Sequence, residues 1–133
     1  MKTVMVNGTF DVLHPGHIAL LNTARSYGDS LIVAIDTDRR VKELKGESRP
    51  INNQVDRRIM LSNLKAVDLV EFFDSTEELI ELMKLYQPAV YVKGSDWKHD
   101  KQSTAEQYCK QVIYYDRVGD YSTTKTIQDI TNR

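Results

Sequence analysis

The chain has 133 residues, of which 41% are hydrophobic and 28% charged, with 18 basic and 19 acidic side chains. This length can bury a core without disulfide or metal support, and the balanced charge gives no reason to expect binding to nucleic acid or to an anionic membrane. A single cysteine, Cys109, excludes an internal disulfide. In the segment MKTVMVNGTF, polar residues interrupt the apolar run too early for a signal peptide. No apolar run in the sequence is nearly long enough to span a membrane. We therefore expect one cytoplasmic domain over residues 1–133.

Five short apolar segments, rich in β-branched residues, predict strands. They cover residues 3–7, 31–36, 68–73, 89–93 and 111–115. Segments with helical spacing lie between them. Strands that are nearly all apolar and alternate with helices indicate a parallel sheet covered on both faces. The sequence therefore predicts an α/β fold, a single Rossmann-like, doubly wound domain with a five-stranded parallel sheet.

Two of the intervening segments carry helix-boundary signals. Residues 17–28 place apolar side chains on one face and end at Gly28, which suits a helix stop. Residues 75–86 open with Ser75 three positions before Glu78, the spacing of a capping box. Both segments are predicted to pack against the sheet.

The stretch NGTFDVLHPGHIALL joins the first strand to the first helix. In a doubly wound sheet, ligands bind at the carboxyl ends of the strands. Gly8 would let a ligand approach the backbone, and Pro15 suits the first helical position. His14 would then cap the helix, and His17 would lie one turn along, with both imidazoles facing the space above the sheet. Because a helix N-terminus attracts anions, the histidine pair indicates a phosphate site. For His99 we expect an ordinary surface or core role.

Several motifs together resemble the small nucleotidyltransferases of the cytidylyltransferase-like superfamily. GTFDVLHPGH (8–17) resembles their His-x-Gly-His signature. LKGESRPIN (44–52), DRRIMLSNLKAVD (56–68) and VKGSDW (92–97) resemble the adenylyltransferase module that makes ADP-heptose from a heptose 1-phosphate. RVGDYSTTK (117–125) is similar to a motif of glycerol-3-phosphate cytidylyltransferase. The resemblance extends over nearly the whole chain.

This resemblance implies a reaction. A phosphate oxygen of a phosphorylated polyol or sugar attacks the α-phosphate of CTP or ATP in line, and pyrophosphate leaves without a covalent enzyme intermediate. Catalysis then depends on positioning and on stabilisation of phosphate charge. Mg²⁺ would be bound mainly through the nucleotide phosphates, with no metal site built from protein ligands, and a homodimer is expected. The motifs leave open both the base, CTP or ATP, and the acceptor, glycerol 3-phosphate or heptose 1-phosphate.

The resemblance also implies three sets of site residues. The catalytic set comprises His14, His17, Lys45 and Arg117. The nucleotide-binding set comprises Gly8, Thr9, Phe10, Arg57, Gly94, Trp97, Ser122, Thr123 and Thr124. The acceptor-binding set comprises Asp11, Asp38 and Lys45. Arg58 is the alternative to Arg57 for the arginine that faces the phosphates.

Each of these sets also has a simpler explanation. Ser122 and its neighbours would suit the β- and γ-phosphates at a helix start, with Arg117 as a further donor, or would be a plain N-cap beside a surface arginine. The basic segment 42–50 would cover the substrate as a mobile loop, or would be a solvated charged loop. Asp11 and Asp38 would orient the acceptor or the loop, or would cap helices. Trp97 would flank the base or fill the edge of the core.

Competing functions lack their motifs. The glycines form neither the P-loop nor the dinucleotide-binding pattern, and the three histidines and one cysteine lack the spacing of a zinc site. A class I aminoacyl-tRNA synthetase would need a longer chain. The alternative that we retain is a catalytically idle nucleotide-binding or regulatory protein.

Overall fold

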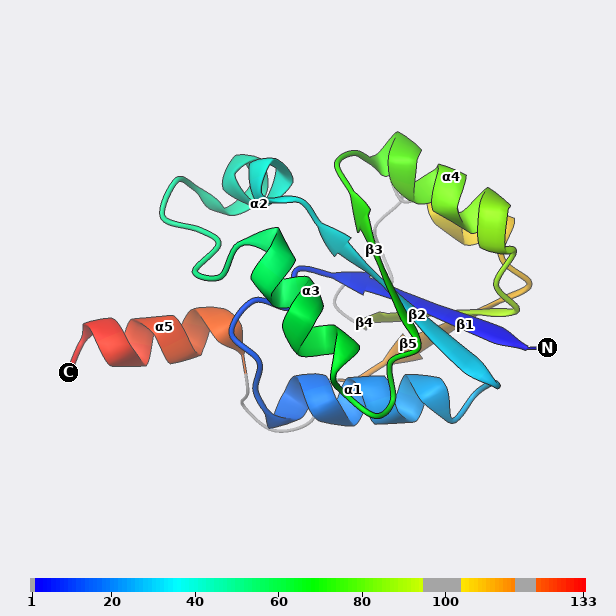
Figure 1. The fold of residues 1–133 in the computed structure, drawn as a ribbon, viewed down its shortest axis with the longest axis horizontal. Coiled ribbons are helices and arrows are strands. Elements are labelled where there is room, and N and C mark those ends of the chain that lie inside the picture. The colour runs from blue at the N-terminus through cyan, green and yellow to red at the C-terminus, as the bar shows by residue number, and fades with distance from the viewer. Residues whose placement is uncertain (1, 95–103, 117–121) are drawn as a thin grey trace.

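A five-stranded, all-parallel sheet in the order β3-β2-β1-β4-β5 forms the centre of the molecule (Figure 1). The computed structural model describes residues 2–94, 104–116 and 122–133. The strands are β1 (Thr3–Gly8), β2 (Ser30–Asp36), β3 (Leu69–Phe73), β4 (Val90–Gly94) and β5 (Gln111–Tyr115). Each begins and ends within one residue of its prediction, and the predicted α/β fold class is confirmed.

Helices connect the strands. They are α1 (Pro15–Arg25), α2 (Asp38–Lys45), α3 (Gln54–Ser62), α4 (Thr76–Tyr86), the short 3-10 helix η2 (Thr104–Tyr108) and α5 (Thr123–Thr131). In Figure 1, α2 and α5 lie toward the carboxyl ends of the strands, away from the N-terminus, and α5 projects beyond the sheet. None of the residues of α5 is buried. No helix within the described ranges is both long and apolar enough to cross a bilayer.

The sheet has a hydrophobic core on each face. Val4 of β1 packs in one cluster with Leu21 of α1 and Leu61 of α3. Met5, the next residue along the strand, packs in the other cluster with Met83 of α4. Because side chains alternate across a strand, these two clusters lie on opposite faces. The doubly wound arrangement is thereby confirmed.

Two local expectations were wrong. The first helix ends at Arg25, so Gly28 does not stop it. A Cβ at position 28 would lie 2.5 Å from the carbonyl oxygen of Lys2, which means that glycine is needed there for close backbone approach. The segment expected as a loop over 42–50 is helical as far as Lys45, because Thr37 caps α2 and Val41 is buried beneath it.

Candidate functional site

The two histidines form a reciprocal cap at the start of α1. His14 is the N-cap residue, and its Nδ1 accepts a hydrogen bond from the backbone N–H of His17 at 3.3 Å. The Nδ1 of His17 accepts from the backbone N–H of His14, also at 3.3 Å. The rings stack with their centroids 3.8 Å apart. Since Nδ1 of each ring is an acceptor, the neutral imidazole carries its proton on Nε2, which becomes a donor.

The loop between β1 and this helix contacts the His17 ring through Phe10. The ring of Phe10 is buried and lies 5.3 Å from that of His17. Phe10 has φ +50°, a conformation that a non-glycine residue adopts only where its surroundings enforce it. A Cβ at Gly8 would come within 2.9 Å of the Phe10 ring, so glycine leaves the room that the ring occupies. The predicted nucleotide-binding backbone of Gly8, Thr9 and Phe10 therefore lies directly beside the histidine pair.

The loop that follows α2 folds back onto the same region through Asp11. The two carboxylate oxygens of this buried residue accept from the backbone N–H groups of Ile51 at 2.6 Å and Asn52 at 2.8 Å. The buried Arg49, which the sequence analysis did not select, places its Nε 3.9 Å from the Asp11 carboxylate. The only available signal for Arg49 was its position in the basic loop. Asp11 thus holds that loop against the end of β1.

Arg57 is buried next to the loop that precedes α1, and its side chain does not face solvent. Its side chain is inaccessible to solvent and donates to the carbonyl oxygens of Asn52 at 3.0 Å and Thr9 at 2.9 Å, and to the carboxylate of Asp38 at 2.9 Å. This position differs from the predicted one, in which Arg57 faces the phosphates. Arg58 is exposed, with its guanidinium 5.3 Å from the Phe72 ring centroid. In this structure Arg57 joins three segments around the site, and Asp38 is one of its partners.

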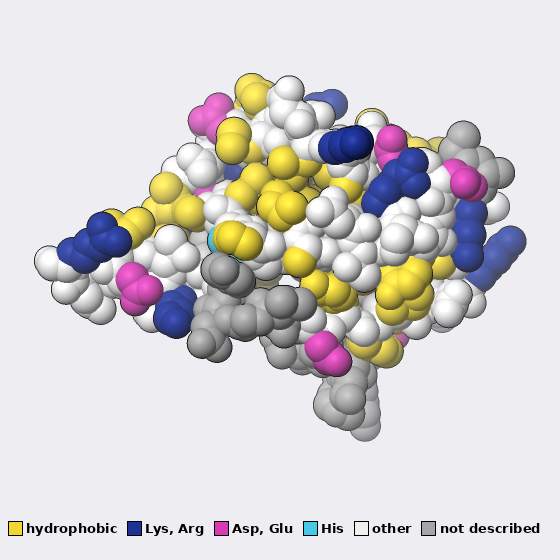
Figure 2. All heavy atoms as spheres, turned by 90° about the horizontal axis from the view of Figure 1, so that it is seen from below, with side chains coloured by type: hydrophobic (Ala, Val, Ile, Leu, Met, Phe, Trp, Pro, Cys, Tyr) yellow, Lys and Arg dark blue, Asp and Glu magenta, His cyan; other side chains and the backbone are white. Residues whose placement is uncertain are grey.

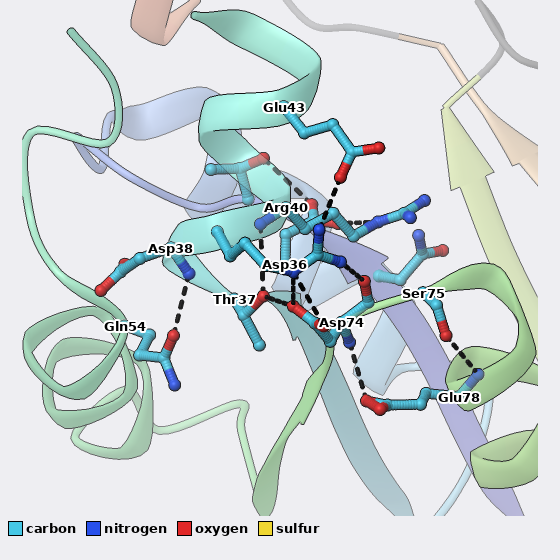
Figure 3. Close-up of polar contacts among 12 residues, drawn as sticks. Asp36, Thr37, Asp38, Arg40, Glu43, Gln54, Asp74, Ser75 and Glu78 are labelled. Atoms are coloured by element: carbon cyan, nitrogen blue, oxygen red, sulfur yellow. Dashed lines mark hydrogen bonds and ion pairs between the residues drawn. The ribbon is translucent and has the colours of Figure 1, made fainter. Parts of the chain in front are cut away.

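A second polar network fixes α2 to the carboxyl ends of β2 and β3 (Figure 3). Asp36 accepts from the Thr9 hydroxyl at 3.1 Å and from the Arg40 guanidinium at 2.8 Å. The Thr37 hydroxyl donates to Asp74. Donation from an arginine and from this hydroxyl lowers the pKa of the Asp74 carboxyl. The network holds the start of α2 against the sheet.

Lys45 and the start of α5 both lie near Arg49. Lys45 is an exposed residue at the end of α2, yet partial desolvation of its ammonium, and then the nearby Arg49 guanidinium, lower its pKa below 10.5. Ser122 caps α5 by accepting from the backbone of Lys125 at 2.9 Å. The Thr123 hydroxyl donates to the carbonyl oxygen of Val12 at 3.1 Å, which attaches α5 to the loop that leads to His14. Residues far apart in sequence therefore lie close together beyond the carboxyl ends of the strands.

Comparison with known protein families shows to which family the chain belongs. A profile of the family described as cytidylyltransferase-like matches residues 5–128. The chain belongs to the cytidylyltransferase-like family. This membership confirms the resemblance inferred from GTFDVLHPGH.

Individual relatives of this cytidylyltransferase-like chain include several bacterial proteins. It is 46% identical over 129 residues to the bifunctional protein HldE of Aliarcobacter butzleri and 43% identical over 129 residues to that of Helicobacter hepaticus. These matches cover 97% of the chain but only 27% and 26% of the two relatives. The chain therefore spans about a quarter of the length of the curated relatives that it matches.

Solved structures show the same fold. A lipopolysaccharide core biosynthesis protein from Thermoplasma volcanium is similar with a TM-score of 0.68 and 30% identity, over 92% of this chain and 99% of that one. Pantothenate synthetase from Thermus thermophilus has a TM-score of 0.61 at 15% identity, over 97% of this chain and 64% of the other, and shows the shared fold alone.

The remaining predicted residues of this cytidylyltransferase-like chain divide into two groups. Gly94 ends β4, which pairs with β1, and so lies at the same edge of the sheet as the histidines. Trp97, His99 and Arg117 lie outside the described residues. Among the residues that the structure does describe, no three His, Cys, Asp or Glu side chains form a group that could hold a metal ion.

A shallow hollow lies beside the first turn of α1. Hydrophobic side chains gather on the side of the molecule where α1 lies, which Figure 2 shows. The hollow has a volume of about 580 Å³ and is lined by Leu13, His14, Pro15, Ile18, Ala19 and Asn22. His14 therefore has apolar neighbours along this hollow.

Proposed function

We propose that this chain transfers an adenylyl group from ATP to a sugar phosphate of the heptose 1-phosphate type and releases pyrophosphate. An oxygen of the acceptor phosphate forms a bond to the α-phosphorus, while the bond from that phosphorus to the bridging oxygen of the β-phosphate breaks. The electron pair leaves with pyrophosphate. No enzyme nucleophile is needed, so the protein acts by positioning the phosphates and stabilising their charge.

One observation carries this proposal, the reciprocal cap of His14 and His17. Each Nδ1 accepts a backbone N–H, so both imidazoles are oriented as Nε2 donors before any substrate arrives. Oriented donors stabilise charge that develops on phosphate oxygens without reorganising during the reaction. The N-terminus of α1 contributes its dipole in the same place.

The relatives favour ATP and a heptose phosphate over CTP and glycerol 3-phosphate. The loop LKGESRPIN resembles the adenylyltransferase of ADP-heptose synthesis, and relatives named bifunctional protein HldE match 97% of the chain. The structural relative of 30% identity is a lipopolysaccharide core biosynthesis protein. The motif around Ser122, which resembles the glycerol enzyme, makes CTP with glycerol 3-phosphate the pair to compare.

Mg²⁺ enters this proposal as part of the nucleotide substrate. The ion would be bound mainly through triphosphate oxygens and water, which are the ligands that Mg²⁺ prefers. There it would neutralise charge on the leaving pyrophosphate.

The test is pyrophosphate release with Mg²⁺, crossing ATP and CTP against heptose 1-phosphate and glycerol 3-phosphate. We expect turnover with ATP and the heptose phosphate. His14→Asn tests the donor separately from the cap, because asparagine keeps an N-cap acceptor but lacks the imidazole Nε2 donor. Nucleotide binding without turnover in all four combinations would contradict the proposal and favour an idle nucleotide-binding protein.

We also propose a cytoplasmic homodimer that uses two small substrates and no nucleic acid. Family resemblance alone supports the dimer. Sedimentation as a monomer at micromolar concentration would contradict it.

A further inference from the structure

Arg49 is a buried cation with incomplete hydrogen bonding. It is 8% exposed, and neither its Nε nor its Nη2 has a hydrogen-bond partner among the described residues. The Asp11 carboxylate lies 3.9 Å from Nε, beyond hydrogen-bond distance, and both of its oxygens already accept backbone N–H groups. Burying a charged donor without acceptors is costly, so the site is suited to a ligand that brings them.

The surroundings of Arg49 favour an anion as that ligand. The Arg49 guanidinium lowers the pKa of Lys45, so the two cations lie close enough to repel each other. Nη1 of Arg49 lies 3.5 Å from the Thr124 hydroxyl, in the first turn of α5. That turn adds backbone N–H groups and the positive end of the helix dipole. A bound anion would relieve the repulsion and satisfy the donors together.

We propose that Arg49 binds a phosphate group of the substrates directly, as a second phosphate contact beside the histidine pair. The planar guanidinium can give two parallel hydrogen bonds to one phosphate. The identity of that phosphate rests on the proposed function, in which it belongs either to the pyrophosphate portion of the nucleotide or to the sugar phosphate. Asp11 has a positioning role, because it holds the backbone that follows Arg49.

Calorimetric titration of the ligand-free chain with inorganic pyrophosphate, inorganic phosphate and heptose 1-phosphate tests this inference. The variant is Arg49→Met, and Lys65→Met, an equal loss of charge at an exposed position before β3, is its control. We expect Arg49→Met to weaken binding of at least one anion by roughly tenfold or more, and Lys65→Met to change none. A loss confined to pyrophosphate places Arg49 on the nucleotide. A loss confined to heptose 1-phosphate, with or without inorganic phosphate, places it on the acceptor.

Stability separates binding from a structural role. Because methionine removes a buried guanidinium whose Nε and Nη2 have no hydrogen-bond partners among the described residues, the ligand-free Arg49→Met variant should melt at or above the wild-type temperature. A lower melting temperature with unchanged anion affinities would overturn the inference. If Arg49→Met does not fold, Arg49→Lys decides, since it keeps the charge but loses the two-pronged geometry and should still bind more weakly.

The two proposals fail separately. Equal anion affinities in wild type and Arg49→Met overturn the role of Arg49, whether or not the chain is active. Loss of affinity in Arg49→Met, in a chain that turns over none of the four substrate pairs, supports an Arg49 anion site and overturns the proposed reaction.

Discussion

The N-termini of α1 and α5, both of which we propose to bind phosphate, are held in place to different degrees. The start of α1 is fixed by a reciprocal side-chain cap, and its helix buries Leu21 and Ala24 against the sheet. The start of α5 has a single-residue cap at Ser122, and no residue of its helix is buried. In the proposed function, α1 would therefore be fixed before a phosphate binds, whereas α5 would gain order when a ligand binds.

The largest expected effect comes from removing the donors at α1 while keeping its cap. In His17→Glu the carboxylate can still accept from the N-cap backbone, as in an ordinary capping box, but it has no N–H donor to offer to a phosphate. We expect kcat to fall on the order of 10²- to 10³-fold. The free energy of unfolding should stay within about 0.5 kcal/mol of wild type, because the cap is retained. Pyrophosphate release and urea unfolding measure the two quantities, and a parallel loss of both would indicate a core histidine.

The second effect tests what holds the loop before α1. Arg57→Met removes donors from two carbonyl oxygens and from Asp38, all at a side chain with no exposed surface. We expect a loss of about 3 kcal/mol in the free energy of unfolding, measured in urea. Arg58→Met, which removes only an exposed contact with Phe72, should cost less than about 1 kcal/mol. Similar losses in both variants would contradict a bracing role for Arg57.

The five strands and the position of His14 as a helix cap were predictable because their signals are local. Apolar runs define the strands, and Pro15 three residues before Ile18 marks a helix start whose cap must be His14. The reciprocal cap itself was not predicted, because imidazoles replace the usual Ser and Glu of a capping box.

The positions of the arginines could not be read from the sequence. Arg49 and Arg57 lie in polar segments, and they are buried only because the loop after α2 folds onto Asp11 and Thr9, contacts that span 40 or more residues. The helix α2 was missed for a related reason. Its sequence DRRVKELK presents one buried residue, Val41, and so has no apolar stripe to find.

The third prediction compares the two kinds of helix through their caps. Ser75→Ala removes the cap of α4, which buries Leu79 and Met83, and should cost about 1 kcal/mol in global stability. Ser122→Ala removes the equivalent acceptor at α5 and should cost less than about 0.3 kcal/mol globally, because no residue of α5 is buried and we expect it to unfold locally. Urea unfolding measures the global effect, and faster amide hydrogen exchange confined to α5 would show the local one. Equal global costs would mean that α5 folds cooperatively with the sheet.

The smallest expected effect is a pH dependence of Lys45, which lies near Arg49. Its lowered pKa means that the folded chain releases this proton at a pH where the unfolded chain still holds it. In that window, below 10.5, the unfolded state binds more protons, so the contribution of Lys45 to stability rises with pH. Affinity for pyrophosphate should move the opposite way, since the ammonium that attracts the anion is lost. Lys45→Arg, which stays charged, should retain affinity at high pH, whereas Lys42→Met on the same helix should follow wild type. Identical alkaline profiles for wild type and Lys45→Arg would remove Lys45 from the anion site, and would leave Arg49 and the start of α5 to bind the phosphate without it.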